Sequence, residues 1–155
     1  MHDLQELSDR TEIHDVVTQM AWCQDRRDWA GLDNVLAEEL DVDYSPGTVG
    51  PVTGVPRAHV VDNWREALER VDASQHVLAG VQVTLHGEAA EVRLNELVWL
   101  TRASAEGSPL YHFGTAMQLR LGRFPAGWRI TSVTVRASWS DGNAAVLGGY
   151  SIDKP

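Results

Sequence analysis

The sequence is poor in several features that would point to a membrane or secreted protein. Its 155 residues contain one cysteine, Cys23, so no internal disulfide can form, and a reducing cytoplasm is the expected location. No apolar run is long enough to cross a bilayer. Residues 1–20 also lack the basic start and continuous apolar centre of a secretory signal. These absences predict a cytoplasmic protein with no membrane partner.

Positive charge is scarce as well. The chain has 13 Lys and Arg against 22 Asp and Glu, a formal net charge of −9, and no basic stripe that would bind phosphates. The spacings H-x-H, H-E-x-x-H, C-x-x-C and G-x-S-x-G do not occur, so neither a metal site nor a serine hydrolase is predicted. Dinucleotide and P-loop fingerprints are missing too. We therefore expect no nucleic acid and no cofactor, and a small apolar molecule as the ligand.

The first half of the chain predicts three helices. The first should run from about residue 8 or 9 to 27, with Asp9 and Glu12 at the spacing of a capping box. The second should be a short helix with apolar residues at 29, 32, 35 and 36, and the third should span about 57–71. Between them, residues 42–45 read as a short strand and 46–56 as a loop, because the latter stretch is rich in proline and glycine.

The second half changes to the alternation of strands. Apolar residues alternate over about 81–85, 92–100, 111–121 and 128–139, with turn residues between these runs. Helices followed by an antiparallel meander are typical of an α+β fold. The length fits a single domain over 1–155, with a core of about 8–140 and a tail of 141–155.

Asp25 is the most informative residue of the chain. At about 100° per residue it falls on the flank of the apolar stripe of the first helix, where a carboxylate needs either solvent or a partner. His76, at the start of the strand-rich half, is a suitable partner. An Asp that orients a His would make a general base, although a solvated Asp25 and a purely structural His76 are the alternative.

Glu96 is the second candidate, because Leu94 and Val98 flank it on the same strand face. Burial there would raise its pKa and allow it to act as an acid near neutral pH. The alternative is a strand whose buried face is instead Asn95, Leu97 and Trp99, which would leave Glu96 outside.

Aromatic and apolar side chains are expected around a ligand. Tyr44 could donate its hydroxyl to a developing oxyanion, or could simply pack. The candidate substrate-contacting residues, which could equally fill a core, are Trp22, Trp64, Phe113, Thr115, Met117 and Trp139.

Four local sequences carry a resemblance that extends over nearly the whole chain. They are Asp25-Arg26-Arg27-Asp28-Trp29, Val42-Asp43-Tyr44, Ser74-Gln75-His76 and Gly127-Trp128-Arg129-Ile130. The chain resembles the SnoaL-like branch of the nuclear transport factor 2-like superfamily, and within it scytalone dehydratase, a bile acid dehydratase and a hexachlorocyclohexane dehydrochlorinase. The resemblance implies a cone-shaped, curved antiparallel sheet wrapped around three N-terminal helices.

The same resemblance implies site residues and an activity. Asp25 and His76 fall on the catalytic Asp–His pair, Tyr44 falls on an oxygen-activating Tyr, and Glu96 falls at or near a second active-site His. The implied activity is a cofactor-independent elimination, such as dehydration. A polyketide cyclase or ketosteroid-type isomerase would use the same base, and a non-catalytic ligand-binding module is the remaining alternative. A homodimer or higher homo-oligomer through the sheet is also expected.

Overall fold

The computed structural model describes residues 4–44 and 50–149. Along the chain the elements are α1 (Leu4–Arg26), the 3₁₀ helix η1 (Ala30–Asn34), β1 (Leu36–Asp43), β2 (Val52–Pro56), α2 (Arg57–Leu68), β3 (Ala73–His86), β4 (Ala89–Thr101), β5 (Leu110–Phe124), β6 (Gly127–Gly142) and the 3₁₀ helix η2 (Ala144–Leu147). None of the described helices is long and apolar enough to span a membrane.

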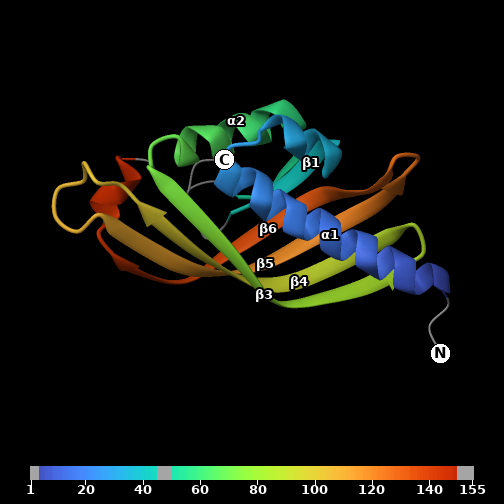
Figure 1. Ribbon diagram of the computed structural model, residues 1–155. Coiled ribbons are helices and arrows are strands. Elements are labelled where there is room, and N and C mark those ends of the chain that lie inside the picture. The colour runs from blue at the N-terminus through green and yellow to red at the C-terminus, as the bar shows by residue number, and fades with distance from the viewer. Residues whose placement is uncertain (1–3, 45–49, 150–155) are drawn as a thin grey trace.

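A single mixed sheet forms the body of the fold. Its six strands run in the order β2-β1-β6-β5-β4-β3, and every neighbouring pair is antiparallel except β1 and β6. The sheet is strongly twisted, and α1 and α2 lie on the same side of it (Figure 1). The expected α+β class and the meander of β3 to β6 are confirmed. The short strand expected at 42–45 overlaps the end of β1, but β1 starts earlier and its parallel pairing with β6 was not indicated by the sequence.

The predicted second helix is wrong. Only Ala30–Asn34 are helical, as one 3₁₀ turn, and Leu36 already belongs to β1. Val35 and Leu36 are buried, and a short apolar run is compatible with a helix or with a buried strand, so the sequence pattern does not distinguish the two. The predicted loop also needs correction, because Val52–Pro56 form β2 and pair with β1; positions 45–49 of that loop lie outside the described residues.

The predicted start of the first helix is wrong too, because α1 begins at Leu4 and the expected capping box lies inside it. Asp9 is buried and accepts hydrogen bonds from Arg123 at 2.5 Å and from the indole of Trp128 at 3.4 Å. Glu12 accepts one from the Trp128 backbone N–H at 2.8 Å. The two carboxylates therefore join α1 to the turn between β5 and β6.

The main core lies between α1 and the concave face of the sheet. Ile13, Val17 and Met20 project from α1 into a cluster that includes Val92 and Leu119 of the sheet. In β3 the pairing with β4 shifts between Ala79 and Gln82, around Gly80, whose φ is 65°. This bulge bends β3 and keeps His76 and Leu78 on the same face as the apolar residues that follow it.

Candidate active site

A cavity of about 360 Å³ opens between the two helices and the concave face of the sheet. Its walls come from α1, α2, β4, β5, β6 and the start of β3, and Leu147 of η2 lies at its edge. The lining is mainly apolar, with polar groups at a few positions: Gln24, Tyr44, Asn63, His76, Glu96, Thr115, Ser138 and Ser140. No Lys or Arg lies among the described lining residues. A small cavity of this kind suits an uncharged organic ligand.

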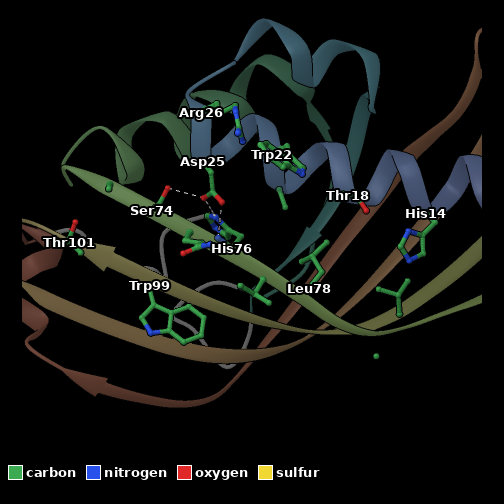
Figure 2. Close-up of a pocket in the computed structure, with 16 residues that line it drawn as sticks. His14, Thr18, Trp22, Asp25, Arg26, Ser74, His76, Leu78, Trp99 and Thr101 are labelled. Carbon is green, nitrogen blue, oxygen red and sulfur yellow. Dashed lines mark hydrogen bonds and ion pairs between the residues drawn. The ribbon is translucent and has the colours of Figure 1, made fainter.

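Asp25 and His76 lie within hydrogen-bond distance, as the sequence predicted. The end of α1 presents the Asp25 carboxylate to the start of β3, where its Oδ1 lies 2.5 Å from His76 Nδ1 (Figure 2). Its Oδ2 accepts the His76 backbone N–H at 2.8 Å. The Ser74 hydroxyl donates to Oδ1 at 3.0 Å. With Nδ1 held by the carboxylate, Nε2 is the ring nitrogen left to act on a ligand.

The environment of Asp25 favours its ionised form. Partial burial by itself would raise the pKa of this carboxyl group. The hydrogen bonds from the ring and backbone of His76, the charge of His76 and the Ser74 hydroxyl act in the opposite direction and bring the pKa below its ordinary value. An ionised Asp25 can stabilise an imidazolium on His76, which is what a proton-accepting His requires.

Glu96 faces the cavity, so the strand alternative that put it outside is wrong. It is 6% exposed, and its recorded side-chain partner is the Thr115 hydroxyl, which donates to Oε2 at 3.2 Å. Desolvation raises the pKa of Glu96, nearby Asp25 raises it further, and the charge of His76 and the Thr115 hydrogen bond only partly oppose this. The strand register places Glu96 opposite Leu78, two residues along from the His76–Val98 pair on the same face. A buried carboxyl group with a raised pKa and an Asp-supported His thus share one wall of the cavity.

Tyr44 borders the cavity from the end of β1. Its hydroxyl accepts a hydrogen bond from Trp64 Nε1 of α2 at 3.0 Å, and both side chains line the cavity. This bond fixes the position of the phenol relative to α2. Tyr44 therefore brings a phenol hydroxyl to the same cavity as His76 and Glu96.

Comparison with known proteins gives a family and a set of similar folds. The model of the SnoaL-like domain matches residues 5–134. The chain belongs to the SnoaL-like family. This agrees with the resemblance drawn from its sequence. No curated protein sequence matches the chain closely enough to count as a relative.

Several solved structures share the fold of this SnoaL-like protein. The Kfla4162 protein from Kribbella flavida is 22% identical with a TM-score of 0.82, over 90% of this chain and 96% of that one. A candidate scytalone dehydratase from Novosphingobium aromaticivorans is 14% identical with a TM-score of 0.74, over 87% of each chain. The dehydrochlorinase LinA-type3 from Novosphingobium barchaimii is 15% identical with a TM-score of 0.77, over 99% of this chain and 100% of that one. At such identities the likeness is one of fold.

Most of the predicted substrate-contacting residues line the cavity of the SnoaL-like protein. Trp64, Phe113, Thr115 and Met117 all do so. Trp139 borders the cavity as well, but its indole lies over Gly114 and 5.6 Å from the ring of His112. His112 in turn stacks on Trp99 at 6.2 Å. We call Trp99, His112 and Trp139 the outer aromatic cluster.

Trp22, also expected to contact the substrate, does not line this cavity. Its side chain is 48% exposed and lies under the guanidinium of Arg26, 3.3 Å from the ring centroid. Met20 and Gln24, four residues apart on α1, line the cavity, and Trp22 between them points to the other side of the helix. There it borders a wider, open groove of about 970 Å³ between α1 and β3 (Figure 2). Asp25 and His76 also border this groove. We place the chemistry in the smaller cavity, because His76 borders it too and Tyr44 and Glu96 border the cavity but not the groove.

Several residues at the site were not predicted. Gln24 is 8% exposed, lines the cavity and precedes Asp25, and Asn63 lies one helical position from Trp64. Ser74 and Arg27 support Asp25 from outside the cavity. The pattern Ser74-Gln75-His76 could have revealed Ser74, since alternate strand residues share a face. Among the described residues no group of His, Cys, Asp and Glu is arranged to hold a metal ion.

Proposed function

We propose that this SnoaL-like protein catalyses an elimination, of the dehydratase kind, on a small neutral oxygenated substrate. The observation that carries the proposal is the convergence of an Asp-supported His and a buried Glu on one apolar cavity. Elimination needs a base that takes a proton from carbon and an acid that gives one to the leaving group. His76 and Glu96 would fill these two roles.

His76 would be the general base. Its Nδ1 is engaged with Asp25, so Nε2 would accept the proton beside a carbonyl or leaving group. Asp25 would hold the ring in the required tautomer and stabilise the imidazolium that forms. Proton transfer of this type contributes typically about 10²–10⁴-fold to a rate.

Glu96 would be the general acid. Burial raises the pKa of Glu96 and so favours a proton on its carboxyl group, and the departing hydroxyl would take that proton and leave as water. The electron pair of the broken C–H bond would form the new double bond as the C–O bond breaks. Tyr44, held by Trp64, would donate its hydroxyl to a carbonyl oxygen of the substrate and stabilise the charge that develops there.

The substrate class follows from the lining of the cavity. The absence of Lys and Arg from the described lining disfavours carboxylates and phosphates, and the apolar walls favour a ring or short hydrocarbon. The fold likeness to a candidate dehydratase and to a dehydrochlorinase supports an elimination as the reaction, since both names refer to eliminations. The proposed mechanism uses only side chains of the protein.

The test is an exchange and elimination assay in D₂O with a panel of neutral cyclic β-hydroxy ketones. The wild-type protein should exchange the proton beside the carbonyl and release water from at least one of them, as followed by NMR and by absorbance of the enone. His76→Gln and Asp25→Asn should suppress both signals. Exchange without loss of the hydroxyl would indicate an isomerase or cyclase instead, and no exchange with any ketone would contradict a general-base role.

A further inference from the structure

Helix α1 ends in an unusual way directly after Asp25. Arg27 has a φ of 58°, and in the described part of the chain it is the one residue other than glycine with a positive φ. Its N–H donates to the Gln24 carbonyl at 3.3 Å, and the Asp28 N–H donates to the Cys23 carbonyl at 2.9 Å. This is a Schellman motif, in which glycine is the usual residue at the left-handed position. An arginine there indicates that its side chain has a role that outweighs the backbone strain.

The Arg27 guanidinium joins three elements around Asp25. Its Nη2 donates to the Leu68 carbonyl at 2.8 Å, at the end of α2. Its Nη1 donates to the Asp25 carbonyl at 3.1 Å and to the Ser74 hydroxyl of β3 at 2.7 Å. Neither Arg27 nor Ser74 is among the cavity-lining residues. Ser74 borders the wider groove beside Asp25 and His76, and both Ser74 and Arg27 reach the smaller cavity only through other residues.

The hydrogen on the Ser74 hydroxyl has one direction available to it. A guanidinium can only donate, so the Ser74 oxygen must accept from Arg27. The single hydroxyl hydrogen is then directed at Asp25 Oδ1, 3.0 Å away. That same oxygen atom lies 2.5 Å from His76 Nδ1. A continuous chain of hydrogen bonds thus runs from the Arg27 cation to the imidazole.

We infer that Ser74 and Arg27 are positioning residues for the Asp25–His76 pair. Arg27 directs the Ser74 hydroxyl onto Asp25, and that hydroxyl keeps the carboxylate ionised and turned toward the imidazole. This inference rests on the proposed function of the pair as a general base. A network that only secured the fold would instead leave the ionisation of Asp25 unchanged when the hydroxyl is removed.

Three other ionisable side chains lie near Asp25, and the test variants must leave them unchanged. They are His76 on β3, Glu96 on β4, whose charge state is coupled to that of Asp25, and Arg26 on α1, whose guanidinium lies on Trp22. A substitution at Ser74 removes a neutral group and leaves all three in place. Any change in the ionisation of Asp25 would therefore come from the lost hydrogen bond.

The experiment is a ¹³C NMR titration of the Asp25 side-chain carbon in the full chain, with the signal assigned by its loss in Asp25→Asn. Ser74→Ala should move the midpoint to higher pH, because it removes a donor to the ionised form. Ser74→Thr keeps a hydroxyl and should stay near the wild-type midpoint. Thr84→Val removes an exposed hydroxyl at the other end of β3 and serves as the control.

Arg27→Gly tests the second link. Glycine relieves the strained backbone, so the variant should keep its fold by circular dichroism while the Asp25 midpoint rises as in Ser74→Ala. Arg27→Asn, which also tolerates the left-handed conformation, replaces it if the glycine variant is unstable. Against a substrate, Ser74→Ala should shift the acidic limb of the kcat/KM profile, whereas Ser74→Thr should not.

The outcomes separate this inference from the proposed function. An unchanged Asp25 midpoint in Ser74→Ala, or an equal shift in Ser74→Thr, would overturn the role of the hydroxyl. An unchanged midpoint in the Arg27 variants would overturn the role of the guanidinium. Neither result depends on turnover, so the proposed elimination would still be decided by the exchange assay.

Discussion

The stability of this protein should fall as the pH rises, because of Glu96. The carboxyl group is 6% exposed in the folded chain, and burial raises its pKa above the ordinary 4.5. The unfolded chain would ionise Glu96 near the ordinary value, while the folded chain keeps the proton to higher pH. Between these two pH values the folded state therefore holds one proton more than the unfolded state, and the free energy of unfolding must decrease with pH.

The slope of this decrease can be worked out. One proton of difference corresponds to about 1.4 kcal/mol of unfolding free energy per pH unit. The full contribution is present below pH 4.5 and is lost by the pH at which Glu96 ionises in the folded protein. Asp9 and Asp25 have pKa values below the ordinary 3.8, so they change the free energy of unfolding in the opposite direction. Their contribution is lost as the pH falls below about 3.8. The two windows do not overlap.

Urea unfolding at a series of pH values, followed by the fluorescence of the six tryptophans, measures this slope. Glu96→Gln keeps the shape and can still accept the Thr115 hydrogen bond, but it cannot ionise, so its stability should be flatter above pH 4.5. Glu91→Gln, on the other face of β4, is the matched control and should follow the wild type. Parallel curves for wild type and Glu96→Gln would refute the assignment of a buried, protonated Glu96.

Four further predictions follow from the same structure. Once a substrate is found, His76→Gln should lose about 10²–10⁴-fold in rate and Asp25→Asn should also be strongly impaired, as measured by steady-state kinetics; near-normal turnover would exclude this base. Calorimetry with the neutral probe 2-naphthol should show about tenfold weaker binding for Trp64→Ala and no change for Trp22→Ala, and the reverse order would place the ligand in the outer groove. Leu119→Ala should cost about 2–5 kcal/mol in urea unfolding, because the side chain is fully buried, and a smaller loss would argue against the described core. Light scattering at micromolar concentration should report a symmetric homodimer that covers the outer aromatic cluster, and a monomer would contradict this.

The second half of the fold could be predicted because its strands alternate over long stretches. Strands β3 to β6 have 13 to 16 residues each, so the period of two is repeated often enough to be distinctive. The same alternation assigns Leu94, Glu96 and Val98 to one face. It could not decide whether that face was the buried one, because the opposite set, with Leu97 and Trp99, is also apolar. Packing against α1 decides this, and packing is a tertiary property.

The first half of the fold was less predictable because its elements are short or have misleading ends. Residues 29–36 contain apolar side chains at helical spacing, yet the chain turns once and enters β1, where a parallel partner 94 residues away in sequence, Ile130, pairs with Leu36. A local pattern carries no information on such a partner. Asp9 and Glu12 likewise have the spacing of a cap, but they accept hydrogen bonds from Arg123 and Trp128 at the far end of the chain.

The expected outer face for association also needs one change. Simple alternation along the last strand from Trp128 predicts that Val133 lies on the outer face of the sheet with Leu97 and Trp99, the face that a dimer would cover. Val133 is 1% exposed and lines the cavity instead. The alternation of inward and outward side chains along β6 changes between the preceding turn and Val133. The shift in register between β5 and β6 at Arg120 and Leu121 lies between that turn and Val133, and it accounts for this change of phase. The outer face is therefore formed by Leu97 and the outer aromatic cluster.

The contact between Asp25 and His76 could be anticipated from their local positions together with the resemblance to the SnoaL-like family. Asp25 lies on the flank of a long amphipathic helix and His76 at the start of a strand, and each position alone calls for a polar partner. What the sequence could not reveal is how the two are brought into contact. That depends on Arg27, which turns the chain in a left-handed conformation and binds the ends of α1 and α2 and the start of β3 through one guanidinium. Glycine is the usual residue at a left-handed helix end, so an arginine in this strained conformation supports the positioning role inferred for its side chain.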